Sequence, residues 1–352
     1  MRETGYGESL ELKLHFTDLA LSIAVRQMTL TDSHGRRINY LRLSVTDRCN
    51  LRCQYCMPAE GVPKLSHDDI LSFEGLRRIA GQAVALGIEK IRITGGEPLV
   101  RRGVVGFLAT LAAIHGLKEM VLTTNGLLLR EMAADLRRAG VQRLNVSLDS
   151  LNPETFATIT RGGDLNQALD GIAAAEEAGF PPVKINMVVM RGINDGEVLE
   201  FAALTLRKPC TVRFIEYMPT RLEPGWKSLC ITGSEVLEQI ARRYPLAPLD
   251  HGNTAGPARN FKIVGAAGTI GVITPISNEF CESCNRIRVT ASGVAKGCLF
   301  TGEGVDLKPY LRCDDDKLKE VLYQIMWKKP SRHKLLNVGS AHAPFAMAQI
   351  GG

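Results

Sequence analysis

The stretch "TDRCNLRCQYCMP" (residues 46–58) places three cysteines, Cys49, Cys53 and Cys56, on one short loop. A cluster of four irons is usually held by four cysteines. Three thiolates leave one iron without a protein ligand, as an open zinc site leaves a position for water or substrate. The loop therefore predicts a four-iron cluster whose free iron binds a small chelating molecule that the cluster can reduce, such as S-adenosylmethionine. A zinc site or a disulfide is the alternative interpretation.

The composition is that of an ordinary globular protein, with 45% hydrophobic and 23% charged residues in a chain of 352. The net charge of +6 is too small and too scattered to indicate a nucleic-acid-binding protein. No run of 18 apolar residues is present to span a membrane, and the first residues do not have the form of a secretion signal. We therefore expect a cytoplasmic protein without a nucleic-acid or membrane partner.

Nine cysteines are present, and six of them fall into two tight groups, which is typical of metal ligands rather than of a disulfide scaffold. The second group is Cys281, Cys284 and Cys298, with Arg286 and Arg288 between its members. Three ligands again leave an iron free, here for a substrate, and guanidinium groups are planar forks suited to phosphate. A structural zinc knuckle with two surface arginines is the alternative. The other three cysteines are expected to be plain, partly buried thiols: Cys210, Cys230 and Cys313.

Strand-like and helical runs alternate from about residue 39 to 245. The predicted strands are 40–45, 90–94, 120–124, 143–148, 183–189 and 211–217, and amphipathic helices are predicted at 74–86, 127–140 and 166–180. Six β–α units in succession predict a parallel sheet with helices outside it, either open or curled toward a barrel.

The pattern changes after residue 245, where β-like runs near 261–264 and 269–274 are followed by a helical stretch near 314–327. We therefore expect three parts. Residues 1–28 form a loosely ordered extension, residues 29–245 the β–α domain, and residues 246–352 a second domain that carries the second cysteine group.

The predicted strands have one apolar and one polar face, because side chains change faces at every residue. Leu41 and Leu43, for example, alternate with Arg42. A parallel strand that is packed on both faces should be almost entirely apolar. A sheet curled around a polar, positively charged cavity explains the pattern, and a sheet with one face open to water is the alternative. The polar face comprises Arg42, Ser44, Arg92, Thr94, Asn145, Ser147, Lys184, Asn186 and Arg213.

These motifs resemble the radical S-adenosylmethionine (radical SAM) superfamily. The resemblance rests on the first cysteine loop, on the aromatic Tyr55 before its third cysteine, and on "TGGEP" (94–98) after the second strand. Longer stretches resemble the branch of the superfamily that acts on GTP in molybdenum cofactor biosynthesis. They are "LRLSVTDRCNLRCQYCMP", "KIRITGGEPL", "LTTNG", "NVSLDS", "CNRIRVT" and the final "GG". The resemblance runs from about Arg36 to the end, except in "AHAPFAM" (341–347).

The resemblance implies a fold, cofactors and a reaction. The fold would be an incomplete (β/α)6 TIM-like barrel of the radical SAM type with a C-terminal α+β iron–sulfur domain. The cofactors would be two [4Fe–4S] clusters and S-adenosylmethionine, and GTP would lie between the clusters. A 5′-deoxyadenosyl radical would take the ribose C3′ hydrogen, and C3′ would attack guanine C8 to give 3′,8-cyclo-7,8-dihydro-GTP, a lyase reaction. A reductant protein and a downstream pyranopterin-forming enzyme would be partners, and a homodimer is compatible with this reading.

The resemblance also implies the site residues, by position. The metal ligands would be the six cysteines of the two groups. S-adenosylmethionine would contact Tyr55, Gly96, Ser147 and Met218, and GTP would contact Arg42, Arg92, Thr123, Lys184, Arg286 and Arg288. The catalytic residues would be Arg286, Arg288, Gly351 and Gly352. Strand alternation leaves open whether Thr123 or Thr124 points inward, and structural ion pairs are the alternative for Arg92 and Lys184.

A terminal pair of glycines would ordinarily be a frayed chain end, but the resemblance implies that this tail enters the active site.

Two competing functions are less well supported by the sequence. Radical enzymes that modify peptides usually carry more than three cysteines in their auxiliary region. An iron–sulfur regulator would need a basic recognition helix to bind DNA, and the sequence presents none.

Overall fold

The computed structural model describes residues 30–66, 68–219, 225–249, 256–301, 304–333 and 347–351. The predictions for residues 1–28 and for Gly352 lie outside these ranges.

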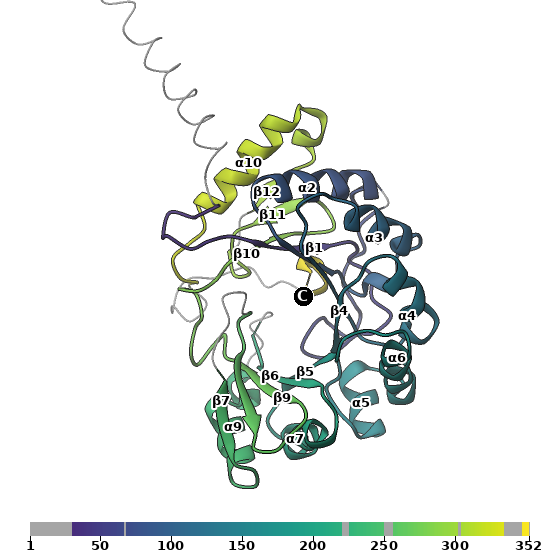
Figure 1. Cartoon of the computed structure of the whole chain (residues 1–352), viewed down its shortest axis with the longest axis vertical. Helices are drawn as coiled ribbons and strands as arrows, with labels where there is room; N and C mark the ends of the chain where they lie inside the picture. The colour runs from purple at the N-terminus through teal and green to yellow at the C-terminus, as the bar shows by residue number, and fades with distance from the viewer. Residues whose placement is uncertain are drawn as a thin grey trace, which may run out of the picture.

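A single curved sheet organises the structure, with the strand order β12-β11-β10-β1-β2-β3-β4-β5-β6-β9-β8-β7. From β10 through β1–β6 to β9 all neighbouring strands are parallel, and β7, β8, β11 and β12 add antiparallel pairs at the two ends. Figure 1 shows helices covering the outer face of this sheet. The chain therefore folds as an incomplete barrel of β–α units, as the sequence predicted.

The six predicted strands of the β–α region are confirmed to within one residue at each end. They are β1 (Tyr40–Ser44), β2 (Lys90–Thr94), β3 (Glu119–Thr124), β4 (Arg143–Ser147), β5 (Lys184–Val189) and β6 (Thr211–Glu216). The later strands are β7 (Leu246–Leu249), β8 (Arg259–Ile263), β9 (Thr269–Ile273), β10 (Arg286–Val289), β11 (Val294–Lys296) and β12 (Val305–Asp306).

Helices connect successive strands and begin at capping side chains. The three predicted helices are α2 (Phe73–Ala85), α4 (Leu129–Arg138) and α6 (Leu165–Glu177), and Ser72 and Asp164 cap α2 and α6 by accepting from backbone N–H groups. The other helices are α3 (Val104–Ala112), α5 (Pro153–Thr160), α7 (Val198–Arg207), α8 (Trp226–Leu229), α9 (Gly233–Ala241), α10 (Asp315–Trp327) and α11 (Met347–Ile350). Short 3₁₀ turns occur at Pro98–Val100 (η1), Asp195–Glu197 (η2) and Pro309–Arg312 (η3).

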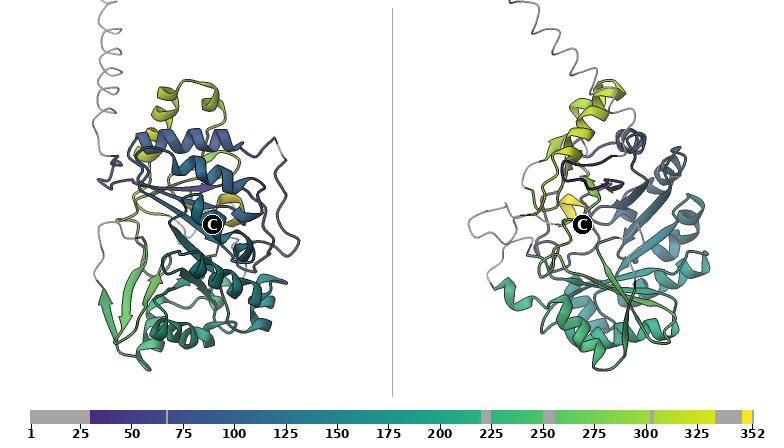
Figure 2. Two further views of the ribbon diagram at one scale, coloured as in Figure 1. Left: turned by 45° about the vertical axis from the view of Figure 1, so that its right-hand side comes forward. Right: turned by 60° about the vertical axis from the view of Figure 1, so that its left-hand side comes forward.

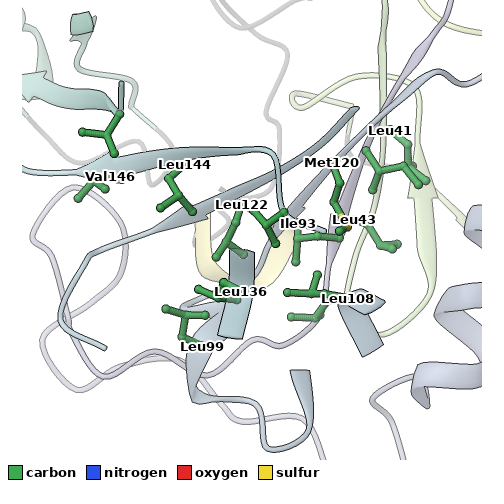
Figure 3. Close-up of a cluster of buried hydrophobic side chains, with 14 of the residues drawn as sticks. Leu41, Leu43, Ile93, Leu99, Leu108, Met120, Leu122, Leu136, Leu144 and Val146 are labelled. Atoms are coloured by element: carbon green, nitrogen blue, oxygen red, sulfur yellow. The ribbon is translucent and has the colours of Figure 1, made fainter. Parts of the chain in front are cut away.

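The hydrophobic core lies between the sheet and these helices. Leu41, Leu43 and Ile93 have no exposed surface and pack with residues of the helices, such as Leu108 and Leu136; Figure 3 shows this cluster. The apolar face of each strand thus meets the helices, as the alternation predicted. Burial of such side chains stabilises the fold by about 1.5–3 kcal/mol each.

The C-terminal part extends the sheet at both edges. Strand β9 pairs with β6, and β10 pairs with β1, both in parallel. The last described residues lie on the inner side of the sheet, opposite the helices, as the turned views in Figure 2 show. The sheet is therefore continuous across residue 245, and the division of the chain into two domains there stays a prediction.

The cysteines outside the two groups differ in burial. Cys230 is partly buried, as expected, but Cys210 is fully buried and Cys313 is exposed, so the prediction was wrong for these two. Cys210 directly precedes β6 in the core, whereas Cys313 follows η3 at the surface. Among the described residues, no helix is long and apolar enough to cross a membrane.

Candidate active site

The first three cysteines lie on the loop after β1. The backbone N–H of Cys56 donates to the carbonyl of Cys53 (2.9 Å), and that of Arg52 donates to the carbonyl of Thr160 (3.1 Å) at the end of α5. All three cysteines are free thiols. Burial raises the pKa of Cys49 to about 11 and that of Cys56 to about 12. Three free thiols on one loop that is anchored by hydrogen bonds fit the ligand set of an iron–sulfur cluster. Binding of the cluster would displace the protons of these thiols.

The glycine-rich turn after β2 packs directly on this loop. A Cβ atom at Gly96 would lie 2.6 Å from the carbonyl carbon of Arg48 and 2.9 Å from the carbonyl oxygen of Asp47, so only glycine fits. The backbone N–H of Glu97 donates to the Arg48 carbonyl (2.8 Å), and the Glu97 carboxylate accepts from the backbone N–H of Asn125 (2.8 Å). These contacts lock three loops together at the carboxyl ends of the strands, where open α/β sheets bind ligands.

Tyr55 is held by a buried carboxylate. Its hydroxyl donates to Asp149 (2.8 Å), whose other carboxylate oxygen accepts from the backbone N–H of Val188 (2.8 Å). Burial raises the pKa of Asp149 to about 6. Tyr55 is thereby fixed beside the first cysteine group.

Cations gather on the inner face of the sheet because the strand register aligns them. Arg42 on β1 is paired with Arg288 on β10 and with Arg92 on β2. Burial, followed by the charges of Arg288 and Arg92, holds the pKa of Arg42 well below its ordinary value. On β5, burial and then the charge of Arg213 lower the pKa of Lys184 to about 7. This face repels further cations and favours a ligand with several negative charges.

Several guanidinium donors on this face are available to a ligand. Among the described residues, Nε of Arg92, Nε of Arg213 and Nη1 of Arg288 are buried and have no hydrogen-bond partner. Neither Arg92 nor Lys184 forms an ion pair within the described ranges. The structural ion pairs considered for these two residues are therefore not found, and the donors fit phosphate oxygens.

The second cysteine group faces the first across the site. Cys281 and Cys284 precede β10, Cys298 follows β11, and all three are free thiols. Nη2 of Arg286 donates to Sγ of Cys284 (3.6 Å). Burial alone would raise the pKa of Cys284, but the positive charges of Arg286 and Lys329 outweigh it and lower the pKa to about 6. A thiol whose thiolate is favoured in this way is suited to bind iron.

One cavity of about 680 Å³ joins both cysteine groups, a volume in the range of small-molecule sites. Its lining includes nearly every residue expected at the site. These are Arg42, Cys49, Cys53, Tyr55, Cys56, Arg92, Gly96, Thr123, Ser147, Lys184, Met218, Cys281, Cys284, Arg286, Arg288 and Cys298. The polar face of the sheet thus encloses a cavity instead of facing open water.

The C-terminal tail reaches the edge of this cavity. The backbone N–H of Met347 donates to the carbonyl of Cys56 (3.1 Å), and the carbonyl of Gly351 accepts from Nη2 of Arg42 (3.4 Å). Gly351 has a φ of +74°, and a Cβ there would lie 2.7 Å from Oγ1 of Thr94. Glycine is therefore required at this position. Gly351 lies beside the cavity, and Gly352 is outside the described residues.

Thr123 and Thr124 both line the cavity, and the hydroxyl of Thr123 accepts from Nδ2 of Asn145 (3.4 Å). Thr124 is buried at the end of β3 and donates to Glu97 (2.9 Å). Both threonines therefore border the cavity: Thr123 has the strand parity of the cavity-lining Glu119 and Val121, and Thr124 borders it at the strand end beside Glu97.

Five further cations line the cavity but were not among the expected contacts: Lys90, Lys118, Arg143, Arg213 and Lys329. Arg213 was already on the predicted polar face. Lys90 lies two residues before Arg92, and Arg143 lies two residues before Asn145. The same alternation could therefore have placed both side chains on the polar face. Asp149 also has the parity of Asn145 and Ser147, but it lies just beyond the end of β4, where alternation is a weaker guide.

Solved structures share this fold. Streptococcus suis SuiB bound to S-adenosylmethionine superposes with a TM-score of 0.58 at 14% identity, over 93% of this chain and 73% of that one. SuiB bound to its precursor peptide SuiA gives 0.60 at 13% identity, over 96% and 74%. At such identities the likeness concerns the fold alone.

Matches to family models and to relatives of higher sequence identity identify the family of this chain more specifically than the shared fold does. Residues 43–205 match the model of the radical SAM superfamily, and residues 210–335 match "Molybdenum Cofactor Synthesis C". The GTP 3′,8-cyclase of Geobacter sulfurreducens is 65% identical over 92% of this chain and 100% of its own length. That of Moorella thermoacetica is 45% identical over the same shares. The chain therefore belongs to the GTP 3′,8-cyclase family of the radical SAM superfamily.

Proposed function

We propose that this protein is a GTP 3′,8-cyclase, a lyase that joins ribose C3′ of GTP to guanine C8 and forms 3′,8-cyclo-7,8-dihydro-GTP. This reaction is the first step of molybdenum cofactor biosynthesis. The observation that carries the proposal is a single cavity with a three-cysteine group at each of two walls and buried cations between them. A family relative with 65% identity over its whole length supports it.

The cofactors are two [4Fe–4S] clusters and S-adenosylmethionine. Cys49, Cys53 and Cys56 would hold one cluster, and the later three cysteines the other. When bound, the first cluster and S-adenosylmethionine supply a 5′-deoxyadenosyl radical that can take the C3′ hydrogen.

The chain's own residues bind and orient the reactants. Tyr55, Gly96, Ser147 and Met218 are proposed contacts of S-adenosylmethionine. Arg42, Arg92, Thr123 and Lys184 are proposed contacts of GTP, since converging guanidinium and ammonium groups offset the charge of a triphosphate. Arg286 and Arg288 would hold the nucleotide near the second cysteine group, and the tail with Gly351 and Gly352 would complete the site beside Arg42.

The proposal includes partners that follow from the reaction. A reductant protein must supply electrons, and a downstream enzyme must convert the cyclised nucleotide into the pyranopterin precursor. Both would be met in the cytoplasm, and a homodimer remains a proposal for the oligomeric state.

An anaerobic assay tests the function. The protein is reconstituted with iron and sulfide, reduced, and given S-adenosylmethionine with either GTP or ATP. We expect 5′-deoxyadenosine and a cyclised dihydro-nucleotide with GTP alone. If 5′-deoxyadenosine forms at the same rate without any nucleotide and no cyclised product appears, the radical chemistry stands and the substrate is wrong.

A further inference from the structure

Two buried cations outside the proposed catalytic groups surround the second cysteine group. The first is Arg36, before β1, which is 8% exposed and whose Nε donates to Asp32 (2.6 Å). Its Nη1 donates to the carbonyl of Cys281 (2.8 Å) and to that of Ser331 (3.1 Å). Its Nη2 donates to the carbonyl of Pro330 (2.8 Å). A residue 245 positions away thus fixes the backbone of a proposed iron ligand.

The second cation is Lys329, just after α10, which is only 3% exposed. Its ammonium donates to the carbonyl of Arg286 (3.0 Å), two residues after Cys284, and to that of Gly297 (2.5 Å). Gly297 directly precedes Cys298, so one ammonium contacts the chain segments of two cysteines. Arg36 and Lys329 are themselves linked, because Nη2 of Arg36 donates to the Lys329 carbonyl (3.4 Å).

The backbone at or near each of the three cysteines is therefore hydrogen-bonded to one of these two cations. Arg36 contacts the carbonyl of Cys281, and Lys329 contacts the backbone two residues after Cys284 and directly before Cys298. A lysine is rarely buried to this extent without an anionic partner. Among the described residues, no carboxylate pairs with Lys329. A cluster bound by three thiolates would provide the anionic partner that the ammonium of Lys329 does not otherwise have.

We propose that Arg36 and Lys329 are positioning residues for the second cluster, and that the buried positive charge of Lys329 also tunes the reduction potential of that cluster. Positive charge near a cluster favours its reduced, more negative state and therefore raises its reduction potential. This inference rests on the proposed assignment of Cys281, Cys284 and Cys298 as cluster ligands.

The test uses the full chain with Cys49, Cys53 and Cys56 all replaced by alanine, so that only the second cluster can form. This parent is reconstituted anaerobically, and its iron content, its electron paramagnetic resonance spectrum after reduction and its midpoint potential are measured. About four irons per chain are expected. If the parent binds no iron, the second site is wrong and the inference fails with it.

Two variants are then compared with the parent. Lys329→Met keeps the length and apolar stem of the lysine but removes its charge. Arg36→Met is combined with Asp32→Asn, so that no buried carboxylate loses its partner. Both should weaken iron retention against a chelator by about 10- to 100-fold, the usual effect of removing a residue that orients metal ligands. Lys329→Met should in addition make the midpoint potential more negative and change the spectrum.

The controls are Lys328→Met and Arg37→Met, which replace exposed neighbours of the two cations and should match the parent. The inference is wrong if Lys329→Met retains iron, spectrum and potential like the parent. A second background has the later three cysteines replaced and the first three intact. If the variants lose iron there as well, Arg36 and Lys329 support the fold as a whole, and the inference is again wrong.

Discussion

At the scale of single residues, Lys184 shows how burial prepares a side chain for an anion. Burial and the neighbouring charge of Arg213 lower its pKa to about 7, whereas a free lysine has a pKa near 10.4. Below pH 7 Lys184 already carries its proton in the ligand-free protein. Above pH 7 it is neutral, and a bound triphosphate would favour its protonation.

GTP binding should therefore take up a proton at pH 8 and take up less at pH 6. Titration calorimetry in buffers of different ionisation enthalpy measures this uptake. The variant Lys184→Arg should lose the pH-dependent part of the proton uptake, because arginine stays charged at both pH 6 and pH 8. Equal uptake by the variant and the original protein at pH 8 would show that another group takes the proton.

Gly96 illustrates a position at which a single methyl group is excluded. The variant Gly96→Ala should be destabilised by about 1–3 kcal/mol, the usual cost of overpacking, because backbone of the cysteine loop occupies the space of a Cβ. It should also lose iron from the first cluster. Chemical denaturation and iron analysis measure the two effects.

Gly81 in α2 provides the matched control, because no atom lies within 4 Å of a Cβ at that position. Gly81→Ala should stabilise the helix by about 0.5–1 kcal/mol and leave the iron content unchanged. If both glycine variants have the same stability and iron content, the close packing at Gly96 is not required for cluster binding.

At the scale of secondary-structure elements, the register of the parallel strands decides which charges meet. Arg213 lies in the middle of β6, opposite Asn186 on β5, and is 9% exposed. Burial and the charge of Arg92 lower its pKa to about 10. The strand thus carries a charge that destabilises the ligand-free protein and suits a polyanionic ligand.

Arg213→Met should consequently have opposite effects on stability and binding. We expect the ligand-free protein to gain about 1 kcal/mol in the free energy of unfolding, as other substitutions that relieve strain at functional sites do. The dissociation constant for GTP should rise at least about tenfold, because a charge-assisted hydrogen bond contributes about 1.5–3 kcal/mol. Denaturation and equilibrium binding measure these quantities. A variant that is less stable yet binds GTP normally would show that Arg213 does not contact the nucleotide.

At the scale of the whole molecule, chain segments far apart in sequence converge on one cavity. Strands β10 and β9 extend opposite edges of the six-stranded β–α sheet. The tail returns from beyond α10 to contact the Cys56 and Arg42 regions. The cavity is therefore complete only when the last residues of the chain have docked against the first strand.

Deletion of Gly351 and Gly352 should abolish GTP cyclisation while both clusters remain, because the tail contacts Arg42 and the cysteines lie elsewhere. Product formation and iron content per chain, measured on the same preparation, separate these two effects. Full activity of the truncated protein would show that the tail has no catalytic part.

Local patterns in the sequence determined much of this protein. The six β–α strands, their polar face and the two cysteine groups all follow from period-two alternation or from short spacing, both of which are local properties. The placement of Thr123 and Thr124 did not follow in this way, because both line the cavity and alternation is ambiguous at a strand end, where Thr124 donates to Glu97.

Only the tertiary structure decided how distant segments meet. Nothing local indicates that Arg36 contacts the carbonyl of Cys281, that Lys329 is buried against the carbonyl of Arg286, or that Gly351 reaches Arg42. The first and the last of these contacts join residues 245 and 309 positions apart. All three depend on strand pairing and on the burial of charge. Both are set by the packing of the complete sheet, since a charged side chain has the same sequence signature in a buried site as on the surface.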